Sequence, residues 1–111
     1  MAMEKTYNKL VRDLIPDIII NNGNICTVSI LDDDRYIAEL KLKLVEESRE
    51  VQNAEAREQI IEELADLLEV LDALTSALDI APSEVGAVRA QKALQNGRFS
   101  SKLFLQTVIE K

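Results

Sequence analysis

The sequence predicts an all-α protein, folded as an antiparallel helix bundle. Aromatic residues make up only 4% of its 111 residues, while Leu, Ile, Ala and Glu are abundant, a composition typical of helices rather than of a β-sandwich. Two long segments also repeat apolar residues three and four positions apart, the period of an amphipathic helix. A chain of this length is expected to form a single domain over residues 1–111.

A short helix and a strand are expected first. The helix spans about residues 14–22, with Pro16 tolerated in its first turn and an Asn-Gly pair at its end. Residues 24–31 (NICTVSIL) alternate in part and are rich in β-branched side chains, which favours a short strand. Because a lone strand needs a partner, we expect a strand pair between residues near 25–30 and residues near 102–107.

Three further helices follow. The first long helix begins at Asp32–Asp34, whose carboxylates suit a helix N-terminus, and runs to about Ala54. The break before Glu58 is short, so the next helix is expected to return antiparallel beside the first and to end near Leu78. A last helix, over about residues 82–96, starts at a proline and stops at an Asn-Gly pair.

Charge and composition narrow the classes of function. The net charge of −7 argues against a polymeric nucleic acid as partner, because such binding depends on clusters of Lys and Arg. No apolar run approaches the roughly 20 residues of a membrane span, and the N-terminus lacks a signal-peptide pattern. Cys26 is the only cysteine, so no disulfide framework is expected. We therefore expect a soluble, cytoplasmic protein that does not bind a membrane.

Two pairs of carboxylates stand in the long helices. Glu47 and Glu50 are three positions apart in the first, and Glu63 and Asp66 repeat that spacing in the second. At about 100° per residue, Glu47 and Glu63 lie at the edge of each apolar stripe, where desolvation costs on the order of several kcal/mol. Facing pairs also repel unless protons or cations intervene. Four oxygen donors suit Mg²⁺, or Mn²⁺ as the alternative, whereas solvated charges on Glu-rich helices are the competing interpretation.

Basic residues near both ends of the chain are candidates for binding phosphate. Lys9 and Arg12 belong to the polar segment TYNKLVRD. Arg98 and Lys102 belong to the loop NGRFSSK that follows the last helix, and Lys92 lies one turn before that loop. For each of them an ordinary solvated surface position is the alternative.

Four segments, in order, resemble one family. EESRE followed by ELAD is similar to the EExxE…ExxD signature of the MazG-like, all-α nucleoside triphosphate pyrophosphohydrolases. The opening YNKLVRD-IP, and the closing Lys-containing helix with its NGRF turn, resemble the branch labelled phosphoribosyl-ATP pyrophosphohydrolase-like. The resemblance spans residues 7–105. It departs from the family at Arg98, which stands where a GGF turn has glycine.

The resemblance implies a metal site and a reaction. The family's metal ligands fall on Glu47, Glu50, Glu63 and Asp66, and Glu46, at the first position of the motif, is the candidate catalytic base. The implied reaction is the Mg²⁺-dependent hydrolysis of a nucleoside triphosphate to its monophosphate and pyrophosphate. The basic residues named above would complement phosphate oxygens that are not on the metal.

Two other functions stay open beside housekeeping cleavage of nucleotides. One is the phosphoribosyl-ATP pyrophosphohydrolase step of histidine biosynthesis, although the YNKLVRD segment favours a side branch. The other is a non-catalytic helical module for binding or assembly. Apolar stripes wider than one helix pair covers, extended by Leu42, Val45, Ile61 and Leu68, predict a homodimer that forms a four-helix bundle, with a tetramer as the alternative. The resemblance implies dimers as well.

Overall fold

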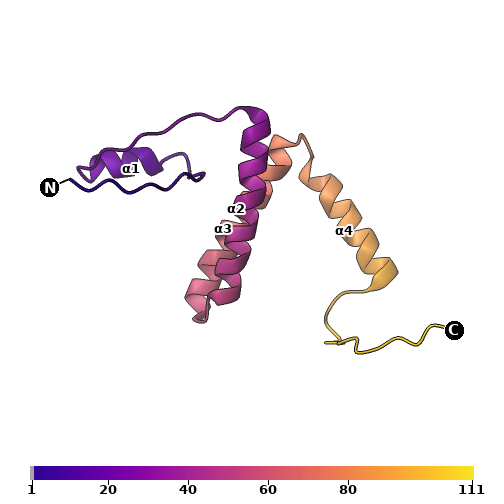
Figure 1. Cartoon of the computed structure of the whole chain (residues 1–111). Coiled ribbons are helices and arrows are strands. Elements are labelled where there is room, and N and C mark those ends of the chain that lie inside the picture. Colours follow the sequence, from indigo (N-terminus) through magenta and orange to yellow (C-terminus); the bar gives the residue numbers. More distant parts are fainter. Residues whose placement is uncertain (1) are drawn as a thin grey trace. The chain divides into compact units, whose positions relative to one another are not determined.

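The computed structural model describes residues 2–111, which form four helices and no strand (Figure 1). The predicted all-α class is therefore confirmed, while a MazG-like bundle stays a prediction. Contacts divide the chain into two compact units, one ending at Asp79 and the other spanning Ile80–Lys111. In the described range, no helix combines the length and the apolar character needed to cross a membrane.

Helices α2 (Asp33–Asn53) and α3 (Arg57–Ala77) lie side by side as an antiparallel hairpin (Figure 1). Asp32 caps α2, because its Oδ1 accepts a hydrogen bond from the Arg35 N–H at 2.8 Å. The chain is extended at Ala54 and at Ala56, which end α2 and precede α3. Both helices have bounds close to those predicted from the sequence.

The seam between α2 and α3 holds the core of the hairpin. Leu40 of α2 is 3% exposed and Val70 of α3 is 8% exposed, and these are the two buried apolar residues within residues 2–111. Leu44, Leu67 and Leu74 beside them are half-buried. The hairpin thus has a thin core, which fixes the facing sides of the two helices.

Helix α1 (Ile15–Asn21) is short and carries Pro16 in its first turn, as predicted. Gly23 follows it with a φ of 84°, in the left-handed region that favours glycine. The Cys26 thiol lies 3.9 Å from the Pro16 carbonyl oxygen, within reach of a weak hydrogen bond. The chain after α1 therefore folds back to contact the start of that helix.

The predicted strand pair is wrong, since residues 2–111 contain no strand. Ile25 is 96% exposed and Ile30 is 100% exposed. In the other predicted strand Leu103 is 91% exposed. Two strands alone are marginally stable in water and need a third strand or a packed helix. β-branched residues favour a strand where they can pack on a half-buried surface. Residues 24–31 have no such surface to pack on.

Helix α4 (Pro82–Asn96) begins at the predicted proline and is followed by Gly97 at a φ of 82°. Ala81 has no side-chain oxygen for capping. Instead the Glu84 carboxylate accepts a hydrogen bond from the Ala81 N–H at 2.7 Å, as the glutamate of a capping box does. The unit Ile80–Lys111 contains no buried residue, so local signals define its helix without a core of its own.

Candidate metal centre

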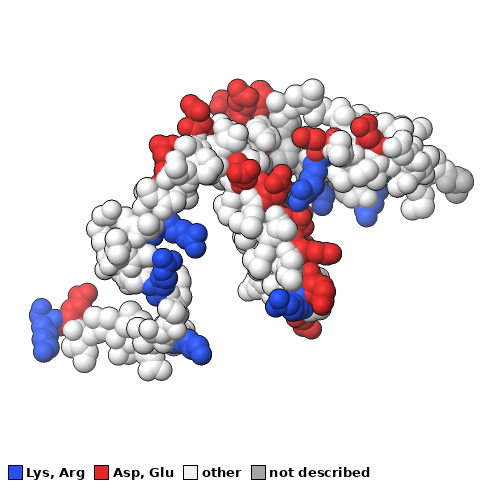
Figure 2. All heavy atoms as spheres, turned by 180° about the vertical axis from the view of Figure 1, so that it is seen from behind, with Lys and Arg blue, Asp and Glu red and all other residues white. Residues whose placement is uncertain are grey.

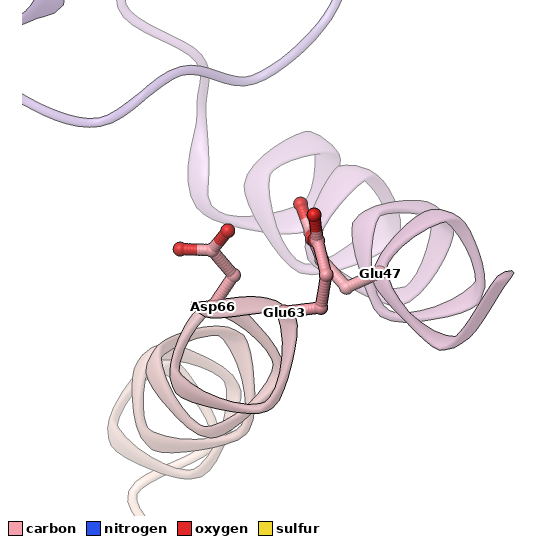
Figure 3. Close-up of side chains that lie close together, drawn as sticks. All are labelled: Glu47, Glu63 and Asp66. Atoms are coloured by element: carbon pink, nitrogen blue, oxygen red, sulfur yellow. The ribbon is translucent and has the colours of Figure 1, made fainter. Parts of the chain in front are cut away.

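Three carboxylates converge on one side of the hairpin. Glu47 projects from α2, and Glu63 and Asp66 project from α3 (Figure 3). One carboxylate oxygen from each lies within 4.8 Å of the other two. The antiparallel turn of the hairpin places Glu47 opposite residues that follow it by more than a dozen positions. We call these three residues the acidic trio.

Glu47 and Glu63 lie at the margin of the core, as the helical angles predict, and Asp66 lies next to them. Glu47 is 9% exposed and counts as buried, while Glu63 and Asp66 are half-buried. Figure 2 shows that acidic side chains also spread along the hairpin on the face seen from behind. The trio differs from those solvated charges because its carboxylates are partly removed from water and face one another.

Two cations partly neutralise the trio. Arg12 Nη2 lies 2.7 Å from Asp66 Oδ1. Lys43 Nζ lies 3.7 Å from Glu47 Oε1 and is itself only 20% exposed. Glu63 has no ion-pair partner in the described part of the chain. Among the described residues, the trio therefore contains one carboxylate without a counter-charge.

The pKa of the Glu63 carboxyl is raised above its ordinary value of 4.5. Partial burial is the largest cause, because it disfavours the charged form. The negative charges of Glu50, Asp66, Glu47 and Glu62 raise it further, in that order. A bound cation would have the opposite effect and would favour the ionised carboxylate.

Glu50 stands outside the trio but close to it. Its carboxylate is exposed and is not among the oxygens that lie within 4.8 Å of one another. Its charge is nevertheless the first of those that raise the pKa of Glu63. Three of the four predicted ligands are thus brought together, and the role of Glu50 as the fourth stays a prediction.

Glu46, the predicted catalytic base, lies between two lysines. Its Oε1 is 3.4 Å from Lys9 Nζ and 3.5 Å from Lys43 Nζ. Its side chain is 40% exposed. The catalytic role of Glu46 stays a prediction.

The basic residues predicted to bind phosphate fall in both units. Lys9 and Arg12 contact the hairpin through Glu46 and Asp66. Lys92 lies in α4, and Arg98 and Lys102 lie in the loop after it. Lys102 has a φ of 59°, and its N–H donates to the Phe99 carbonyl at 3.1 Å in a tight turn. The phosphate role of all five residues stays a prediction.

The sequence analysis missed Lys43. A signal for it was present, because Lys43 stands three and four positions before Glu46 and Glu47, the spacing at which helical side chains meet.

A shallow hollow of about 360 Å³ lies near the turn of the hairpin. Its lining consists of Glu55, Arg57, Ile60, Ile61 and Leu64. It is open and belongs to the exposed apolar side of α3, so it does not enclose the acidic trio.

Comparison of the chain with protein-family models, with curated proteins and with solved structures finds no match.

Proposed function

We propose that this chain is a cytoplasmic hydrolase that cleaves a nucleoside triphosphate to its monophosphate and pyrophosphate with the help of Mg²⁺. The supporting observation is the convergence of Glu47, Glu63 and Asp66 from two packed helices. The similarity of EESRE and ELAD to the MazG-like signature points to the same residues and supplies the reaction class. Mn²⁺ is the alternative cation.

The trio fits a hard divalent cation. Oxygens around one Mg²⁺ lie about 2.1 Å from the ion and hence at most about 4.2 Å apart. The trio oxygens lie within 4.8 Å of one another, so small side-chain rotations suffice to close around an ion. Three carboxylates leave coordination positions for water and phosphate, as catalytic Mg²⁺ sites require. When bound, the ion neutralises the triphosphate and lowers the pKa of a coordinated water.

The remaining residues have roles around that site. Arg12 and Lys9 stand beside the trio and carry charge suited to phosphate oxygens. Glu46 is proposed to accept the proton of the attacking water, after exchanging its lysine contacts for that water. We also propose phosphate contacts for Lys92, Arg98 and Lys102, on the strength of the family resemblance.

The active form is proposed to be a homodimer. Ile61, Leu64, Leu68 and Leu71 form a stripe along α3 at the spacing of one helix face, and they are 39–65% exposed. A second copy of the hairpin has the same stripe and buries it by completing a four-helix bundle. Light scattering is expected to give a mass of twice the 12.4 kDa of the chain, or four times the mass of the chain if two dimers form a tetramer. Leu68→Lys should lower the measured mass. An active monomer would contradict this assembly.

Release of pyrophosphate tests the proposed function. Standard and modified nucleoside triphosphates and phosphoribosyl-ATP are incubated with the protein, in Mg²⁺ or in EDTA. We expect release from at least one nucleoside triphosphate in Mg²⁺ alone. A response to phosphoribosyl-ATP only would point to the histidine pathway. No release from any compound would favour the non-catalytic module.

Two variants test whether that activity depends on the acidic trio. Glu63→Gln removes one charge of the trio and should lower turnover by about 100-fold or more, since even outer-shell changes at metal sites cost about 10- to 100-fold. Glu69→Gln removes the same charge from an exposed position of the same helix and should leave turnover unchanged.

A further inference from the structure

Two ion pairs hold the N-terminal segment on the hairpin. Arg12 contacts Asp66 at 2.7 Å, across 54 positions of sequence. Lys9 contacts Glu46 at 3.4 Å, across 37 positions. No backbone hydrogen bond fixes residues 2–11. Side-chain contacts with the hairpin therefore anchor this segment, and we call residues 5–13 the N-terminal strap.

The anchor of the strap coincides with the acidic trio. Asp66 is both the partner of Arg12 and one of the three converging carboxylates. A divalent cation and a guanidinium on the same carboxylate repel each other. Both ion pairs are largely exposed, with 59% of the Arg12 side chain and 45% of the Lys9 side chain accessible. Exposed pairs of this kind contribute little to stability, so a cation that binds Asp66 can displace Arg12 at small cost, and the Lys9–Glu46 pair that remains holds the segment only weakly.

We propose that Arg12 holds the N-terminal strap on the acidic trio in the metal-free protein, and that a divalent cation competes with Arg12 for Asp66 and releases the strap. The inference rests on the metal site of the proposed function but not on its substrate. The released guanidinium is then free to bind an anion. Because coupling between two ligands is reciprocal, removal of Arg12 must strengthen cation binding.

Limited digestion of the wild-type protein with trypsin tests the release. Cleavage after Lys9 and Arg12 is followed by mass spectrometry in EDTA and in Mg²⁺. We expect Mg²⁺ to accelerate it roughly two- to fivefold, the range open to a weak exposed contact. Cleavage after Lys102, in the other unit, serves as the internal reference and should keep its rate. An unchanged ratio between the two rates would overturn the inference.

Calorimetric titration with Mg²⁺ tests the reciprocal effect. Arg12→Gln should bind the ion more tightly than the wild type, by at most about fivefold. Arg49→Gln is the matched control, because Arg49 lies on α2 and forms no ion pair in the described residues. The gain should be larger in Arg12→Gln than in Arg49→Gln. Equal gains would show an effect of net charge alone and would contradict competition at Asp66.

These readouts separate the strap from the enzymatic reaction. Neither digestion nor titration involves a nucleotide, so a protein without pyrophosphate release can still show strap release. Conversely, if the protein releases pyrophosphate but its digestion is unaffected by Mg²⁺, the proposed function stands and the inference about the strap is wrong.

Discussion

Helices α2 and α3 pack against each other, whereas α4 has no second helix within its own unit. The hairpin buries Leu40, Val70 and Glu47, while the unit Ile80–Lys111 buries no residue. Packing therefore does two things in the hairpin that α4 cannot do alone. It brings carboxylates from distant positions together, and it removes part of their hydration.

The charged residues of the two units also differ in their exposure to water. The trio is partly buried, and the pKa of Glu63 is raised as a result. The basic residues of the second unit lie on exposed positions of one helix and one loop. Charges at exposed positions interact weakly and are screened by salt. We therefore expect metal chemistry to depend on the fold of the hairpin.

The largest effect is expected on stability, when a core leucine of the hairpin and an exposed leucine of α4 are each replaced by alanine. Leu40 is 3% exposed and Leu94 is 89% exposed. Leu40→Ala should lower the free energy of unfolding by about 2–5 kcal/mol, through lost burial and the cavity left behind. Leu94→Ala should stay within about 0.5 kcal/mol of the wild type. Urea unfolding measures the free energy of unfolding of both variants, and equal losses would show that the buried leucine stabilises the protein no more than the exposed one.

A smaller effect is expected at the edge of the trio. Glu50→Gln should lower pyrophosphate release by about 10- to 100-fold if Glu50 is the fourth ligand or supports the other three. The helical circular dichroism should be unchanged, because Glu50 is exposed. Near-normal turnover in this variant would restrict the metal site to Glu47, Glu63 and Asp66.

The smallest expected effect is the pH dependence of stability without metal. The pKa of Glu63 is raised in the folded protein, so its ionisation disfavours folding. Its contribution to stability is complete below about pH 4.5 and is lost as the pH rises through the folded-state pKa. In EDTA, the melting temperature of the wild type relative to Glu63→Gln should therefore fall from pH 4.5 towards pH 7. A difference that stays constant or rises would contradict the raised pKa of Glu63.

Much of the helical architecture could be predicted from the sequence. The bounds of α2 and α3 follow from Asp32, the short connection at residues 54–56 and the apolar period. Their close approach follows from the same features, because a short connection leaves an antiparallel return as the simplest path. The approach of the pair Glu47/Glu50 to the pair Glu63/Asp66 could thus be expected from the sequence, whereas the position of Glu50 outside the trio could not.

Other features depend on contacts that local patterns do not encode. The β-branched run at residues 24–31 has strand propensity, but propensity reflects a surface to pack on, and none is provided there. The contact of Arg12 with Asp66 joins residues 54 positions apart, beyond any periodicity. The contacts of Lys43 with Glu46 and Glu47, by contrast, follow from helical spacing and could have been predicted.

Direct binding of Mn²⁺ tests the central claim that Glu47, Glu63 and Asp66 form a divalent cation site. The electron paramagnetic resonance signal of free Mn²⁺ is recorded as wild-type protein, Glu63→Gln or Glu69→Gln is added, and Mg²⁺ is then added as competitor. We predict that wild type and Glu69→Gln remove the free signal, that Mg²⁺ restores it, and that Glu63→Gln binds at least about tenfold more weakly. A free Mn²⁺ signal that the wild-type protein leaves unchanged, or equal binding by all three proteins, would contradict the account.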